Sequence, residues 1–196
     1  MHLRESLKEN KIISLLIELS SSQVFWIFSF SILTAVAAEI TIPVKPIPFT
    51  FQTMIVVLSG AFLGAKKGFY SQIIYLSLGV LGFPVFAQIP DASFGFARLF
   101  GPTGGYLLAF PLAALLTGYL VKNRKTYFRV ILAMLSGNTL ILILGSIYLG
   151  TFYMKNIMLG FEAGLIPFLL WEIVKVFIGS NIYFGILRKH SDESKK

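Results

Sequence analysis

The segment LIPFLLWEIVKVFIGSNIYFGIL, residues 165–187, decides the fold that the sequence predicts. Almost all of its side chains are apolar, and it is long enough to cross a bilayer, because a membrane-spanning helix needs about 20 such residues. The segment also holds a carboxylate, Glu172, and three residues later an ammonium, Lys175. Side chains three residues apart lie on one face of a helix. We therefore expect both charged groups to point into the protein and not toward lipid.

Two explanations account for charges in such a segment. In the first, Glu172 and Lys175 only neutralise each other, although an apolar pair of similar volume often serves stability as well. In the second, they form a polar ligand site, which is the usual meaning of ionisable residues inside a membrane. Each charge costs about 2.5 to 3.5 kcal/mol at the centre of an inserted helix. We favour the ligand site because mutual neutralisation alone does not explain why the chain retains two groups that are costly to insert.

The composition of the 196-residue chain is that of an all-α polytopic membrane protein. Hydrophobic residues make up 56% and charged residues 13%, whereas about 25% charged residues is typical of soluble domains. We expect a single membrane domain over residues 1–196. The chain has no cysteine, and its two histidines, His2 and His190, lie near the ends. No metal site, cofactor, ATP-binding loop or nucleic-acid-binding motif is expected.

Six apolar runs predict six transmembrane helices within a core over residues 24–187. A cytoplasmic or interfacial segment, residues 1–22, precedes this core, and a basic tail, residues 188–196, follows it. The proline-rich link at 42–49 is predicted to be non-helical, and Lys66-Lys67-Gly68 is predicted to be a tight basic turn. The runs are residues 24–40, 50–65, 69–83, 103–121, 128–149 and 165–187.

The distribution of basic residues predicts the orientation of these helices. With both termini in the cytoplasm, the outer segments hold only Lys45, Arg98 and Lys155. This asymmetry satisfies the positive-inside rule and predicts a multi-pass protein of the plasma (inner) membrane that contacts anionic lipids. The thirteen inner residues are Arg4, Lys8, Lys11, Lys66, Lys67, Lys122, Arg124, Lys125, Arg129, Arg188, Lys189, Lys195 and Lys196.

Further candidate residues lie in the connection at 84–102 and just after it. Gln88 is either a pocket residue or a loop hydrogen-bonding residue, and Arg98 is either a ligand-binding residue or an anchor to lipid phosphate. Together with Glu172, Lys175 and aromatic side chains such as Tyr106, they would suit a small, partly apolar molecule. Such a ligand would have an anionic end and an amide-like end, since arginine binds carboxylates in a fork geometry.

Small residues follow one side of the first apolar run. Ala35 lies four residues after Ser31, and Ala38 lies four residues after Thr34. Small residues at this spacing let helices approach closely in a membrane. They indicate either packing within the chain or a docking face for another subunit.

Four motifs resemble those of the BioY family, the biotin-binding S components of energy-coupling factor (ECF) vitamin transporters. Two of them, GVLGFPVFA at 79–87 and LFGPTGGYL at 99–107, resemble the family signature most closely. PFTFQT at 48–53 and GLIPF at 164–168, the latter followed by Lys175, fit the family as well. The resemblance extends from about residue 30 to 180.

The resemblance implies an S-component fold of six helices that captures biotin on the outer side for ATP-driven uptake, without catalysis. The implied partners are a transmembrane coupling protein, which would dock near Ala35 and Ala38, and a pair of ABC-type ATPases. A related S component for another small heterocyclic vitamin is the first alternative. A membrane-embedded enzyme is a second, disfavoured because no nucleophile–base pair or metal cluster is visible.

The resemblance also assigns roles to individual residues. Glu172 and Lys175 would lie at the biotin ureido group, Gln88 at the ring system and Arg98 at the valerate carboxylate. The sequence departs from the family in two places: Leu-Leu-Trp-Glu at 169–172 replaces the usual Pro-Gly-Asp, and Gln88 replaces an asparagine.

Overall fold

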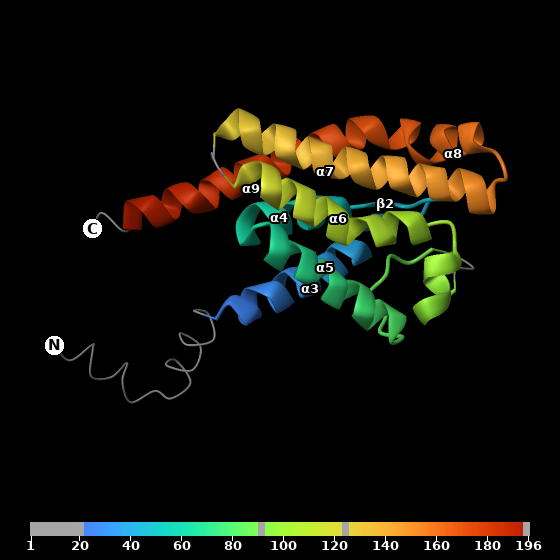
Figure 1. Cartoon of the computed structure of the whole chain (residues 1–196), viewed down its shortest axis with the longest axis horizontal. Helices are drawn as coiled ribbons and strands as arrows, with labels where there is room; N and C mark the ends of the chain where they lie inside the picture. Colours follow the sequence, from blue (N-terminus) through green and yellow to red (C-terminus); the bar gives the residue numbers. More distant parts are fainter. Residues whose placement is uncertain (1–21, 90–92, 123–125, 194–196) are drawn as a thin grey trace.

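A computed structural model describes residues 22–89, 93–122 and 126–193 of the chain, and each of the six apolar runs forms a helix in it (Figure 1). The predictions for residues 1–21, for Asn123, Arg124 and Lys125, and for the side chains of 188–196 lie outside the described residues. The helices are α3 (Gln23–Glu39), α4 (Gln52–Leu63), α5 (Ala65–Val80), α6 (Gly104–Val121), α7 (Tyr127–Tyr148) and α9 (Leu169–Glu193).

The chain is mostly helical, and within its described residues three stretches are long and apolar enough to cross a membrane. These stretches are Gly104–Val121, Tyr127–Tyr153 and Ile157–Leu187. Two further helices, α3 and α4, are apolar but shorter than 18 residues. The structure therefore has the architecture of a helical membrane protein, while the count of six crossings and the side of the termini stay predictions.

The turn between α4 and α5 differs from the prediction. Gly64 makes this turn with a φ of 80°, a conformation that a residue without a Cβ adopts at no steric cost. Helix α5 then begins at Ala65, so Lys66 and Lys67 lie in its first turn and not in the predicted basic turn.

The C-terminal run is also divided differently from the prediction. A short helix, α8 (Ile157–Gly164), precedes it, and a 3-10 helix at Ile166–Phe168 separates α8 from α9. A proline in a helix interior would remove a backbone hydrogen bond and clash with the preceding turn, so Pro167 lies at the start of a helical segment. Helix α7 continues as a π-helical turn over Leu149–Tyr153.

The proline-rich link is non-helical, as predicted, and contains two short strands that were not predicted. Strands β1 (Thr41–Ile42) and β2 (Phe49–Thr50) pair antiparallel, with Thr41 opposite Thr50 and Ile42 opposite Phe49. The link returns the chain across one end of the bundle, where α9 begins (Figure 1).

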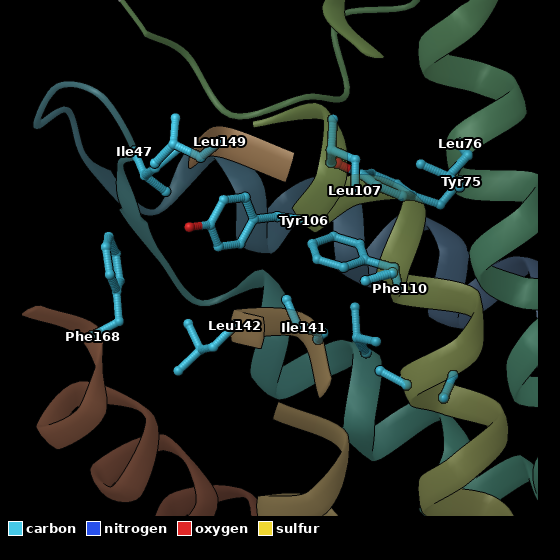
Figure 2. Packing of buried hydrophobic residues seen from close by; sticks show 14 residues of the cluster. Ile47, Tyr75, Leu76, Tyr106, Leu107, Phe110, Ile141, Leu142, Leu149 and Phe168 are labelled. Carbon is cyan, nitrogen blue, oxygen red and sulfur yellow. The ribbon is translucent and has the colours of Figure 1, made fainter. Parts of the chain in front are cut away.

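Helix α6 is the centre of the bundle, and α4, α5 and α7 pack against it. Glycines permit the close approach: a Cβ on Gly60 would lie 2.1 Å from the carbonyl oxygen of Ala114. Figure 2 shows the apolar cluster that links α5, α6 and α7 to Phe168 in the 3-10 helix before α9, with Tyr106 pointing toward the side where Ile47 and Leu149 lie. This cluster forms the floor and walls of the site described next.

Candidate functional site

A cavity lies at the end of the bundle where β2, the 3-10 helix Gly95–Phe100 and the starts of α6 and α9 meet. Its volume is about 50 Å³. Apolar side chains form most of its wall. One of them is Phe168, which stacks on Phe49 with 4.4 Å between the ring centroids. Its polar side chains are Thr50, Gln52, Thr53, Arg98, Thr103, Tyr106, Glu172 and Lys175.

Glu172 and Lys175 form a buried ion pair in the wall of this cavity. The Lys175 Nζ lies 2.6 Å from Glu172 Oε1, and the two residues are 1% and 5% exposed, respectively. Lys175 also donates to the backbone oxygen of Thr50 at 3.1 Å and to the Thr53 hydroxyl. Three acceptors therefore satisfy the three protons of the ammonium.

The carboxylate of Glu172 is less fully used than the ammonium. Its donors among the described residues are Lys175 and the Thr53 hydroxyl, which lies 2.9 Å from Oε2 and 3.1 Å from Oε1. An ionised carboxylate accepts about four hydrogen bonds. Because Glu172 lines the cavity, its remaining acceptor capacity is available to a ligand with N–H donors.

Arg98 supplies a buried cation from the 3-10 helix. It is 5% exposed, its terminal nitrogen donates to the backbone oxygen of Ala87, and its Nε has no partner among the described residues. Burial lowers the pKa of the Arg98 guanidinium, and the neighbouring Tyr75 raises it. Arginine stays charged in proteins, so Arg98 is a positive group with a donor left for an anion.

Tyr106 lines the cavity from the first turn of α6. Its hydroxyl donates to the backbone oxygen of Gly164 at 2.8 Å and lies 3.2 Å from Ser146 Oγ. Two glycines make room for it, since a Cβ on Gly164 would lie 2.1 Å from the hydroxyl and one on Gly145 would lie 2.3 Å from the ring. The position of Tyr106 is therefore fixed by its surroundings.

Four of the five predicted ligand-site residues come together at this cavity, and one does not. Gln88 is exposed and lines a neighbouring cavity of about 40 Å³, to which Arg98 also belongs. Arg98 therefore lies between the two cavities. The other three residues, Tyr106, Glu172 and Lys175, lie with Arg98 around the first cavity.

The two predicted docking residues contact their own chain. Ala38 is fully buried, and Ala35 is partly buried and packs against the core cluster of Figure 2. Their observed contacts fit the packing explanation, and docking of another subunit at Ala35 and Ala38 stays a prediction.

Four polar residues of the cavity were not predicted, namely Thr50, Gln52, Thr53 and Thr103. Gln52 donates to the Tyr75 hydroxyl at 2.5 Å, and Tyr75 donates to the backbone oxygen of Val85, which ties the link to the 84–102 connection. Thr53 bridges Glu172 and Lys175, and the Thr103 hydroxyl is buried without a partner among the described residues. The motif at 48–53, which contains Gln52 and Thr53, is the part of the sequence from which these two residues could have been predicted.

A metal centre has no support from the side chains that can be placed. Within residues 22–89, 93–122 and 126–187, no three histidine, aspartate or glutamate side chains gather closely enough to hold an ion. The polar groups that line the cavity are one carboxylate, two cations, one amide and several hydroxyl groups, set among apolar side chains.

A model of the BioY family matches residues 9–192. The chain belongs to the BioY family. The biotin transporter BioY of Thermotoga maritima is 35% identical over 153 residues, which cover 78% of this chain and 88% of that protein. The biotin transporter BioY2 of Lactococcus lactis subsp. cremoris is 32% identical over 162 residues, covering 82% and 87%.

A solved structure has a similar fold. It is a crystal structure of the S-component for biotin from an ECF-type ABC transporter, with a TM-score of 0.76 and 23% sequence identity. The match covers 85% of this chain and 90% of the other. The helical arrangement of Figure 1 is thus similar to that of this S-component.

Proposed function

We propose that this BioY-family chain is the substrate-binding (S) subunit of a vitamin importer and captures biotin from the outer side of the membrane. One observation carries the proposal: the buried Glu172–Lys175 pair forms part of the wall of a cavity that Arg98 also lines. A pair that served only to neutralise itself would need no cavity. The relatives named above are transporters of biotin and not enzymes.

Each polar end of the cavity suits one end of biotin. The free acceptor capacity of Glu172 would take the ureido N–H groups, and Lys175 would orient Glu172 or donate to the ureido oxygen. Arg98 would hold the valerate carboxylate through a charge-assisted contact, which is stronger than a neutral hydrogen bond. Tyr106 and the aromatic walls would enclose the ring system, and Gln88 would contact the ligand only if the two neighbouring cavities join.

The volume of the cavity indicates that binding involves movement. A space of about 50 Å³ holds only a few water molecules, because each water needs roughly 10 to 15 Å³ on this measure. Entry of a vitamin therefore requires the walls to separate.

The S-component fold supports a proposal about partners and membrane topology. We propose six crossings, both termini in the cytoplasm and a location in the plasma membrane. Uptake would be driven by ABC-type ATPases through a transmembrane coupling protein, docked on the α3 side near Ala35 and Ala38. The chain would then be a capture subunit that does no chemistry on its ligand.

A ligand titration tests the proposed function. Purified chain in detergent is titrated with biotin, desthiobiotin, riboflavin and thiamine. Saturable binding of biotin, with weaker desthiobiotin and no riboflavin or thiamine, is expected. Preferential binding of riboflavin or thiamine would favour an S component for another heterocyclic vitamin. Absence of saturable binding to all four would refute vitamin capture by the isolated chain.

A further inference from the structure

A second, larger cavity lies at the opposite end of the bundle from the biotin site. It has a volume of about 500 Å³ and lies between the end of α4, the start of α5 and the end of α6. Three lysines reach it from two elements: Lys66 and Lys67 from α5, and Lys122 from the end of α6. Phe62, Leu63 and Tyr119 supply an apolar part of its lining.

No carboxylate among the described side chains neutralises these lysines. The acidic residues whose side chains are described are Glu39, Glu162 and Glu172, which belong to the end of α3, to α8 and to the start of α9. Glu172 lines the first cavity, and Glu39 lies two residues before β1, whose partner strand β2 contains the cavity residue Thr50. Helix α8 lies at that end of the bundle as well (Figure 1). Within the described part of the chain, all charged side chains that line this cavity are therefore basic.

The backbone adds to this positive charge. Lys66 and Lys67 are the second and third residues of α5, whose first turn contains no acidic residue and whose N-cap, Gly64, has no side chain to satisfy free N–H groups. Helix N-termini carry a partial positive charge, so cations are disfavoured there and anions are favoured. Two lysines at this position make sense where an anion from outside the chain binds between them.

The location and the mixed lining identify the class of anion. Arg129 adds a fourth described basic side chain at this end, where it donates to the backbone oxygen of Leu120. Membrane proteins place such an excess of basic over acidic residues at the cytoplasmic surface. Anionic headgroups are concentrated at that surface. Tyr119 is 67% exposed, as is typical of an aromatic side chain at headgroup level. Apolar side chains beside the lysines suit a lipid better than a free phosphate ion.

We propose that this cavity binds the phosphate-bearing headgroup of an anionic lipid, with Lys66, Lys67 and Lys122 contacting the phosphate and Phe62 and Leu63 contacting the start of the acyl chains. The headgroup would neutralise the first turn of α5 and fix the α4–α5 turn in the membrane surface. This lipid site is separate from the biotin cavity and does not depend on which vitamin the chain binds.

Native mass spectrometry of the full chain tests the lipid site. The purified chain in detergent is mixed with equal amounts of phosphatidylglycerol and phosphatidylcholine, and the ratio of the two lipid complexes is measured. Wild type is expected to retain phosphatidylglycerol preferentially. Each lysine replaced by glutamine should lower this preference roughly fivefold, and the triple variant Lys66→Gln/Lys67→Gln/Lys122→Gln on the order of 100-fold.

Two controls separate lipid recognition from loss of fold or of net charge. The triple arginine variant at the same positions keeps the charge and should keep the preference. Lys155→Gln removes one charge at the other end of the bundle and should leave the preference unchanged. Thermal unfolding and gel filtration of every variant establish that the comparison is made between folded chains.

The proposal fails under any of three results. Equal retention of the two lipids by the wild-type chain overturns it, whatever other anion or acidic protein segment binds there. A folded triple glutamine variant that keeps the preference also overturns it. Displacement of phosphatidylglycerol by inorganic phosphate at similar concentration would assign the cavity to a free anion and overturn the lipid assignment.

Discussion

Replacing Glu172 by alanine tests the proposed biotin site most directly, because this carboxylate has acceptor capacity that its described neighbours leave unused. One charge-assisted hydrogen bond contributes about 1.5 to 3 kcal/mol, which corresponds to a factor of roughly 10 to 150 in affinity. Glu172→Ala is therefore expected to weaken biotin binding at least about tenfold. Titration calorimetry of the purified chain measures the change.

The same substitution also affects stability, and the structure gives the size of that effect. Without Glu172, the Lys175 ammonium stays buried with only Thr50 and Thr53 as acceptors. Breaking a buried pair by removing one partner costs about 3 to 5 kcal/mol in free energy of unfolding. The double variant Glu172→Ala/Lys175→Met removes both charges and should recover much of this loss, while its biotin affinity stays low.

The two readouts therefore separate ligand contact from folding. Glu162→Ala is the matched control, because Glu162 is exposed on α8 at the same end of the molecule and outside the cavity. It should leave both affinity and stability unchanged. Wild-type biotin affinity in Glu172→Ala, or in the double variant, would remove Glu172 from the site and refute the assignment.

Three further predictions concern other parts of the structure. Arg98→Ala should weaken biotin binding by about 1.5 to 3 kcal/mol and leave binding of biotin methyl ester unchanged; an equal loss for both ligands would contradict carboxylate recognition. Gly164→Ala should lower the free energy of unfolding by about 1 to 3 kcal/mol, since its Cβ would overlap the Tyr106 hydroxyl. The control Gly185→Ala, whose Cβ would have no atom within 4 Å, should leave the free energy of unfolding unchanged. Thermal unfolding of the two variants, compared with wild type, tests this difference. Asn138→Leu should raise the free energy of unfolding by about 1 to 3 kcal/mol, because both polar atoms of this buried amide have no partner among the described residues. A lower free energy of unfolding for this variant, measured by chemical denaturation, would show that the amide is satisfied.

The buried pair explains why the two sequence-level explanations were hard to separate. Glu172 and Lys175 do neutralise each other, as the structural explanation requires, and they also line a cavity, as the ligand-site explanation requires. Sequence spacing gives the shared helix face in both cases. The cavity also depends on Thr50 in β2 and Thr53 at the start of α4, which contact the pair from outside α9.

Local signals in the chain account for the successes and the misses in the predicted elements. Apolar runs marked all six long helices, since hydrophobic length is a local property. Helix α8 was missed although Asn156 caps it through bonds to the backbone nitrogens of Met158 and Leu159, because its eight residues are too few for a membrane-spanning pattern. The start of α5 was predicted too late in the chain, because two adjacent lysines followed by a glycine are typical of a turn. In the structure Gly64 makes the turn, and the lysines already belong to the helix.

The sequence by itself determined the helical membrane class, the family and the presence of two charges on one face of the last helix. These properties follow from residue type and from spacing within one turn, and neither depends on distant parts of the chain. Only the tertiary structure decided that Arg98 and Tyr106 join Glu172 and Lys175 while Gln88 lies in the neighbouring cavity. That choice depends on how the link at 42–49 and the described parts of the 84–102 connection cross the end of the bundle, and such irregular backbone has no periodicity from which its path can be read.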